Sequence, residues 1–177
     1  MEKKLVVFLD SGDTLIDEGT ELRDGNGIVI SAELIPGADL LVRTLFEQGY
    51  LLALVADGAA RSFDNIYSQN GLDLYFSARI YSEHIGAEKP DSRMFRAAAD
   101  ALGLEPSDYS RILMMGNNLS RDIRGANALG MISVLLSWTP RYPLVPADEE
   151  EVPDYTISQP LQLLELVERL DAELRLG

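Results

Sequence analysis

Short runs of apolar residues recur along the chain, and each run ends at a polar or glycine-containing segment. Continuous apolar runs of this kind are typical of strands that are buried on both faces of a parallel sheet. They predict strands at residues 6–9, 51–55, 78–81, 112–115 and 132–136. A further short strand is expected at residues 154–157, at the edge of the sheet.

Apolar residues at helical spacing lie between these runs. The pattern predicts helices at residues 38–48, 59–70, 91–102, 120–129 and 161–176. Three of these helices are followed by a glycine, a residue that commonly ends helices: Gly71, Gly103 and Gly130. The alternation of strands and helices predicts an α/β fold, namely a doubly wound, Rossmann-like parallel sheet with helices on both faces.

Two segments fall outside this alternation. Residues 17–36 follow the first strand and contain the turn sequence Asp-Gly-Asn-Gly at residues 24–27, which predicts a small β-hairpin flap. Residues 139–153 are rich in proline and acidic residues and are expected to form a surface loop. We therefore expect one α/β domain over residues 1–177, in which residues 154–177 add a C-terminal strand and helix.

The charge balance narrows the choice of partners. The chain has 29 acidic residues against 15 Lys and Arg, a net charge of −14, and such a surface repels polyanions. We therefore expect neither nucleic acid nor a membrane as a partner. The absence of cysteine and the single histidine exclude disulfides, thiolate nucleophiles and metal sites built from Cys or several His. Because no signal-peptide pattern or long apolar run is found, a cytoplasmic protein is expected.

Chemically useful side chains lie where a ligand would bind in such a fold, at the carboxyl ends of the strands. Asp10 ends the first predicted strand, residues 116–122 follow the fourth, and Lys89 precedes a predicted helix. Each has a purely structural alternative. Asp10 could cap a turn, Lys89 could be an ordinary exposed lysine, and Asp122 could complement a helix dipole.

Together, these motifs resemble those of the haloacid dehalogenase-like (HAD) hydrolase superfamily. Residues 10–15 (Asp-Ser-Gly-Asp-Thr-Leu) resemble its first motif, Lys89-Pro90-Asp91 its lysine motif, and residues 116–127 its acidic motif. The resemblance implies a Mg²⁺-dependent phosphohydrolase, or phosphatase, that forms an aspartyl–phosphate intermediate. Its substrate would be a small-molecule or macromolecular phosphate ester.

The resemblance also implies roles for individual residues. Asp10 matches the nucleophile, and Lys89 matches the lysine that binds phosphate and restrains the nucleophile. Mg²⁺ would be held by Asp10, the main-chain carbonyl of Gly12 and the side chain of Asn117. Asp122 matches the second acidic position, close to the metal and to Lys89. Such oxygen ligands are those that octahedral Mg²⁺ prefers.

The general acid is the first departure from the family's pattern. Gly12 stands where family phosphatases usually carry a second Asp that acts as general acid and base. Loss of such a group lowers rates by about 10²–10⁴-fold, and alkoxide leaving groups, which need a proton, suffer most. Asp13, one position further on, becomes the candidate catalytic acid if the loop is rotated by one residue.

The residues at the family's phosphate-binding and metal-binding positions also differ from its pattern. Ala56 stands where a Ser or Thr binds phosphate in the family. The backbone N–H groups of Ala56, Asp57 and Gly58 would have to replace that hydroxyl. Asn117 replaces a carboxylate and so removes one negative charge from the metal site. These changes leave open an alternative function, that of a catalytically impaired HAD-like protein with a phosphate-binding or regulatory role.

The segment between the first two motifs is short. Residues 17–36 suffice for a hairpin but not for the helical cap domain that many relatives insert there. An open, capless site favours large substrates or closure by a homo-oligomer. It argues against the third alternative, dehalogenase-type carbon–halogen hydrolysis, because the cap encloses the halide in that subfamily.

Overall fold

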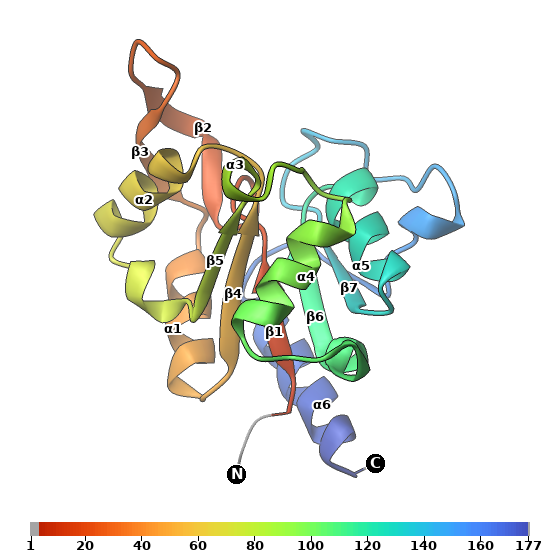
Figure 1. Ribbon diagram of the computed structural model, residues 1–177. Coiled ribbons are helices and arrows are strands. Elements are labelled where there is room, and N and C mark those ends of the chain that lie inside the picture. The colour runs from red at the N-terminus through yellow and green to blue at the C-terminus, as the bar shows by residue number, and fades with distance from the viewer. Residues whose placement is uncertain (1–3, 177) are drawn as a thin grey trace.

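The computed structural model describes residues 4–176 and contains a six-stranded parallel sheet (Figure 1). The strand order is β5–β4–β1–β6–β7–β8, so the first strand lies inside the sheet with β4 and β6 on either side. The predicted doubly wound α/β fold is therefore confirmed. The strands of the sheet are β1 (Val6–Leu9), β4 (Leu51–Ala56), β5 (Ala78–Tyr81), β6 (Ile112–Gly116), β7 (Ile132–Leu136) and β8 (Tyr155–Ile157).

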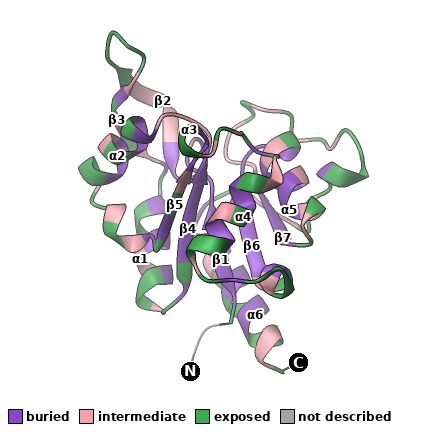
Figure 2. Cartoon of the chain, in the orientation of Figure 1, coloured by how far each residue is buried: buried purple, intermediate pink, exposed green. Residues whose placement is uncertain are grey.

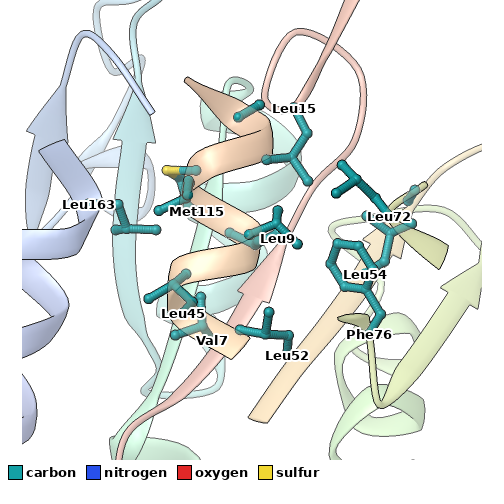
Figure 3. Close-up of a cluster of buried hydrophobic side chains, with 14 of the residues drawn as sticks. Val7, Leu9, Leu15, Leu45, Leu52, Leu54, Leu72, Phe76, Met115 and Leu163 are labelled. Atoms are coloured by element: carbon teal, nitrogen blue, oxygen red, sulfur yellow. The ribbon is translucent and has the colours of Figure 1, made fainter. Parts of the chain in front are cut away.

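Side chains of each strand alternate between two apolar layers, one on each face of the sheet. In β1, Val7 and Leu9 pack with helices α1, α2 and α6, whereas Val6 and Phe8 pack with α4 and α5. Figure 3 shows the first layer, and Figure 2 shows that the strands are buried along most of their length. These helices are α1 (Ala38–Glu47), α2 (Ala60–Gln69), α4 (Ser92–Ala101), α5 (Arg124–Ala128) and α6 (Gln162–Leu176).

The predicted helix at residues 120–129 is divided in two. A single π-helical turn, η3 (Leu119–Ile123), precedes the short helix α5. The side chain of Asn118 caps the turn by accepting hydrogen bonds from the N–H groups of Ser120 and Arg121. The remaining short helices are α3 (Ser82–Ile85), η1 (Asp73–Tyr75), η2 (Pro106–Arg111) and η4 (Glu149–Glu151), which apolar periodicity did not predict.

The predicted hairpin is present and longer than its turn sequence indicated. Antiparallel strands β2 (Ile16–Arg23) and β3 (Val29–Leu34) form it. It packs against α2, where the N–H of Val29 donates to the Ser62 hydroxyl at 3.0 Å. In Figure 1 it rises above the sheet beside α2. The described chain inserts only this hairpin between β1 and α1, so residues 4–176 carry no cap domain.

The proline- and acid-rich segment at residues 139–153 crosses the surface as a loop that contains η4. Its acidic end is tied to α5, because Arg124 forms ion pairs with Asp148 at 2.7 Å and with Glu151 at 3.0 Å. Its other end reaches the first motif through Arg141. Across residues 4–176, no helix combines the length and the apolar character that a membrane span requires.

Candidate active site

The sheet register places Asp10 at the carboxyl edge between two neighbouring strands. Leu9 pairs with Leu54 on one side and with Met115 on the other. The next residue, Asp10, donates its N–H to the Met115 carbonyl at 3.0 Å and leaves the sheet there. Its carboxylate therefore lies at the point where β4 and β6 also end, as the sequence predicted. Thr14, in the loop that follows, donates its hydroxyl to Asp10 Oδ2 at 3.0 Å.

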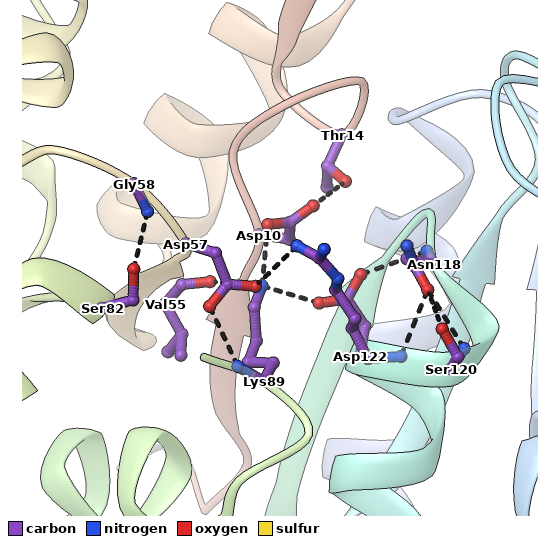
Figure 4. Close-up of polar contacts among 11 residues, drawn as sticks. Asp10, Thr14, Val55, Asp57, Gly58, Ser82, Lys89, Asn118, Ser120 and Asp122 are labelled. Carbon is purple, nitrogen blue, oxygen red and sulfur yellow. Dashed lines mark hydrogen bonds and ion pairs between the residues drawn. The ribbon is translucent and has the colours of Figure 1, made fainter. Parts of the chain in front are cut away.

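Lys89 joins the carboxyl ends of three strands through its ammonium group. Nζ donates to Asp10 Oδ1 at 2.8 Å, to Asp122 Oδ1 at 2.7 Å and to the Val55 carbonyl at 2.8 Å (Figure 4). These three bonds use all three ammonium hydrogens. Burial opposes the charged form, but the carboxylates of Asp10 and Asp122 outweigh it and raise the pKa of Lys89 above its usual value. Lys89 is thus a buried lysine whose charged form is favoured by its partners, not an exposed surface lysine.

Asp122 is brought to this cluster by the π-helical turn. Its Oδ2 accepts the N–H of Asn118 at 3.1 Å, while Oδ1 accepts Lys89, so both oxygens are bound within the protein. Burial and then the nearby Asp10 carboxylate raise the pKa of Asp122, and Lys89 counteracts them. Gly116 permits the approach, because a Cβ atom there would lie 2.1 Å from Asp122 Oδ2.

Replacing Gly116 with alanine is therefore expected to destabilise the protein. The added methyl group would displace the Asp122 carboxylate from Lys89, and overpacking of this kind costs about 1–3 kcal/mol. Urea unfolding monitored by circular dichroism measures the loss as a lower midpoint. Gly25→Ala is the matched control, since a Cβ atom at Gly25 meets nothing within 4 Å. Equal stability of the two variants would contradict this account of Gly116.

At the end of β4, one of the three backbone donors predicted to bind phosphate is already used within the protein. The N–H of Gly58 donates to the Ser82 hydroxyl at 2.8 Å and so already has a partner. Asp57 accepts the N–H of Lys89 at 2.9 Å, and Arg121 lies 3.5 Å from its other oxygen. Burial raises the pKa of Asp57, while Lys89 lowers it. Asp57 thus fixes the backbone that carries Lys89.

The structure does not bring Asp13 into the pocket. Its side chain is fully buried, one oxygen is ion-paired with Arg141, and the other accepts the N–H of Glu18 at 3.1 Å. Asp13 adopts a φ of 48°, in the left-handed region, and its carboxylate lines no part of the pocket around Asp10. Asp13 therefore supports the loop and has no position from which to protonate a leaving group at Asp10.

Glu18 occupies the place expected for the missing catalytic side chain, and the sequence reasoning overlooked it. Its Oε1 lies 1.9 Å from the position that a Cβ atom on Gly12 would take. Burial, followed by the Asp13 carboxylate, raises the pKa of Glu18 to about 7. Strand periodicity could have indicated that Glu18 points inward, because it shares a face of β2 with the buried Ile16.

The residues expected to hold Mg²⁺ present suitable donors. Asp10 and Asn117 line one pocket together with Gly12. Asn117 is 3% exposed, and among the described residues its amide nitrogen has no hydrogen-bond partner. Because the amide oxygen and nitrogen exchange places on rotation, an oxygen ligand can be presented at the same point. This donor set fits a hard cation. Asp122 lines the same pocket, and its two oxygens, like those of Asp10, accept hydrogen bonds within the protein.

The pocket around Asp10 has a volume of about 180 Å³. The hairpin, α2 and the surface loop all contribute to its walls. Segments that are separate in the sequence therefore shape one site. Acidic groups outnumber basic ones along these walls. The charged lining residues are Asp10, Glu18, Glu21, Asp57 and Asp122 on the acidic side, and Arg23, Lys89 and Arg121 on the basic side.

Comparison with known proteins identifies similar sequences and folds. The sequence profile of haloacid dehalogenase-like hydrolases matches residues 22–136. A glyceraldehyde 3-phosphate phosphatase from Methanopyrus kandleri is 33% identical over 141 residues, which cover 78% of this chain and 59% of the relative. A phosphoserine phosphatase from Thermus thermophilus is 33% identical over 70% of this chain and 47% of the relative.

Solved structures share the fold. A HAD phosphatase from Thermococcus onnurineus superimposes with a TM-score of 0.66 at 25% identity, over 77% of this chain and 59% of the other. The chain spans about half the length of the curated relatives it matches. The similarity therefore covers most of this chain but only part of those proteins.

Proposed function

Since this chain belongs to the haloacid dehalogenase-like hydrolase family, we propose that it is a Mg²⁺-dependent phosphohydrolase whose nucleophile is Asp10. The observation that carries the proposal is the buried cluster at the carboxyl edge of the sheet. Lys89 binds Asp10 at 2.8 Å and Asp122 at 2.7 Å, and Asp10 also faces the pocket. A fixed carboxylate beside a buried cation is suited to attack on an anionic phosphoryl group.

The reaction would proceed in two displacements. An oxygen of Asp10 bonds to phosphorus while the bond between phosphorus and the leaving oxygen breaks, which gives an aspartyl phosphate and, once the leaving oxygen has taken up a proton, an alcohol. Water then attacks phosphorus, the bond to Asp10 breaks, and inorganic phosphate leaves with the carboxylate restored. Lys89 keeps Asp10 oriented throughout and offsets the charge of the phosphoryl group.

The proposed metal site consists of Asp10, the Gly12 carbonyl and Asn117. The acidic excess of the pocket supports a divalent cation, because a phosphate dianion would otherwise face mainly carboxylates. Bound Mg²⁺ neutralises charge on the phosphoryl oxygens and orients the phosphate. The structural feature that supports the assignment of Asn117 as a ligand is its buried amide, whose nitrogen has no hydrogen-bond partner within residues 4–176.

The proposed function is tested by assaying acetyl phosphate, nitrophenyl phosphate and a 2-haloacid, each with Mg²⁺ and with EDTA. We expect Mg²⁺-dependent release of inorganic phosphate and no halide. Phosphate binding without turnover would favour the catalytically impaired alternative, and halide release would favour the dehalogenase. The relatives' names support a small phosphomonoester as substrate, such as a phosphorylated triose or amino acid.

Asn117→Asp is expected to tighten Mg²⁺ binding, because it restores a carboxylate to the proposed metal site. One added charge near a partly buried cation contributes on the order of 1–2 kcal/mol, or roughly tenfold in Kd. Isothermal titration with MgCl₂ measures the change without any need for activity. Asn26→Asp adds the same charge at an exposed hairpin turn and serves as control. Unchanged or weaker binding in Asn117→Asp would remove Asn117 from the ligand set.

A further inference from the structure

An alkyl phosphate releases an alcohol, so a proton must reach the leaving oxygen during the first displacement. Five carboxyl groups line the pocket, and four of them are already engaged. Asp10 is the nucleophile, and both oxygens of Asp122 accept hydrogen bonds within the protein. Asp57 accepts the N–H of Lys89, and Glu21 is ion-paired with Arg23.

Glu18 also has an ion-pair partner, but its carboxyl group is the one that lies against the nucleophile's loop with an oxygen left over. Arg141, which is not among the residues that line the pocket, lies 3.3 Å from its Oε2 and so anchors one oxygen. The other oxygen, Oε1, lies against Gly12, where a Cβ atom would be only 1.9 Å away. Gly12 is two residues after Asp10, so the absence of a side chain there is what admits the Glu18 carboxyl group.

We propose that Glu18 is the catalytic residue that protonates the leaving group, an inference that rests on the proposed phosphohydrolase function. In the first displacement, Glu18 gives its proton to the leaving oxygen as the phosphorus–oxygen bond breaks. In the second displacement, the resulting carboxylate takes a proton from the attacking water as the bond between phosphorus and Asp10 breaks. The proton taken from water restores Glu18 to its starting form, so the cycle is balanced.

The same geometry explains why Asp13, although adjacent to Gly12, does not compete for this role. Arg141 contacts both acids, but Asp13 is fully buried and Glu18 lines the pocket. Asp13 also accepts the N–H of Glu18 at 3.1 Å. Asp13 and Arg141 are therefore positioning residues that hold the base of β2 and the Glu18 side chain in place.

The test measures the two displacements separately in Glu18→Gln. Protein is mixed with acetyl phosphate or with an alkyl phosphate such as glycerol phosphate, both with Mg²⁺, and quenched in acid. Intact mass spectrometry then follows the phosphoryl group on Asp10. Acetate needs no proton to leave, so we expect near-normal phosphorylation from acetyl phosphate, followed by accumulation of the phosphoenzyme. Phosphorylation by the alkyl phosphate should fall by about 10²–10⁴-fold.

Two further variants separate a chemical role from a structural one. Glu33→Gln makes the same change on the exposed face of the same hairpin, outside the pocket, and should leave both steps unchanged. Gly12→Asp alone should impair the protein, because its side chain would collide with Glu18. Combined with Glu18→Ala, Gly12→Asp has room, and we expect partial recovery of the alkyl phosphate reaction.

The outcomes distinguish this inference from the proposed function. If wild-type protein forms no phosphoenzyme and releases no phosphate from acetyl phosphate, the phosphohydrolase itself is refuted and Glu18 loses its role with it. If wild type is active but Glu18→Gln behaves as Glu33→Gln does, only the assignment of Glu18 is overturned. A uniform loss with both substrates and no accumulated phosphoenzyme would also overturn it, since that result indicates a structural role.

Discussion

Asp10→Asn is expected to abolish phosphoryl transfer, lowering turnover by about 10⁴-fold or more, as loss of a nucleophile does in enzymes that form covalent intermediates. The amide keeps the size of the carboxyl group, its oxygen can still accept from Lys89, and its NH2 group can donate to the Thr14 hydroxyl. The fold should therefore persist. Mass spectrometry after mixing with acetyl phosphate should show no phosphoenzyme, and circular dichroism should be unchanged.

Asp100→Asn provides the matched control, because Asp100 is exposed on α4 and lies outside the pocket. It should retain wild-type turnover. A folded Asp10→Asn protein that still released phosphate at the normal rate would refute Asp10 as nucleophile, and with it the proposed phosphohydrolase mechanism.

Lys89→Met is expected to have the largest effect on stability. The substitution keeps the length of the side chain but leaves Asp10 and Asp122 facing each other without a cation, in a site where Lys89 is 3% exposed. Removal of one partner from a buried ion pair typically costs about 3–5 kcal/mol. Urea unfolding in EDTA should show this loss, and the variant should also lose activity with every phosphate substrate.

A second substitution identifies the cause of that loss. In Lys89→Met/Asp122→Asn, a neutral amide replaces one of the two carboxylates left without a cation. Part of the free energy of unfolding should therefore return, while activity stays absent. Double-mutant analysis of the two single variants and the pair then gives the coupling between Lys89 and Asp122. A double variant with the summed losses of the two single ones would show that the residues do not interact.

Much of the fold was predictable because it depends on local pattern. The continuous apolar runs identified the strands of the sheet, and helix bounds differ from the prediction by one residue at α1 and α2. The exception is the predicted helix at residues 120–129. There the Asn118 cap and the bond from Asn118 N–H to Asp122 impose a π-helical turn that apolar spacing does not encode.

Part of the candidate site was predictable for the same reason. Asp10 and residues 116–122 follow strands directly, and parallel neighbours end at one edge, so the strand order alone brings them together. The length of the hairpin was harder to predict from the sequence. The strand β3 extends to Leu34 because the hairpin packs on α2, and the turn sequence does not encode that contact.

The sequence by itself determined the strands of the sheet and the polar residues that follow them. It also determined that Asp10, Lys89 and Asp122 lie together. Only the tertiary structure decided which carboxyl group faces the pocket. Asp13 is turned away by Arg141, which lies 128 residues further along the chain, and Glu18 enters the space that Gly12 leaves. The physical reason is that strand and helix patterns depend on neighbouring residues, whereas the direction of a polar side chain depends on charges and empty space supplied by distant segments.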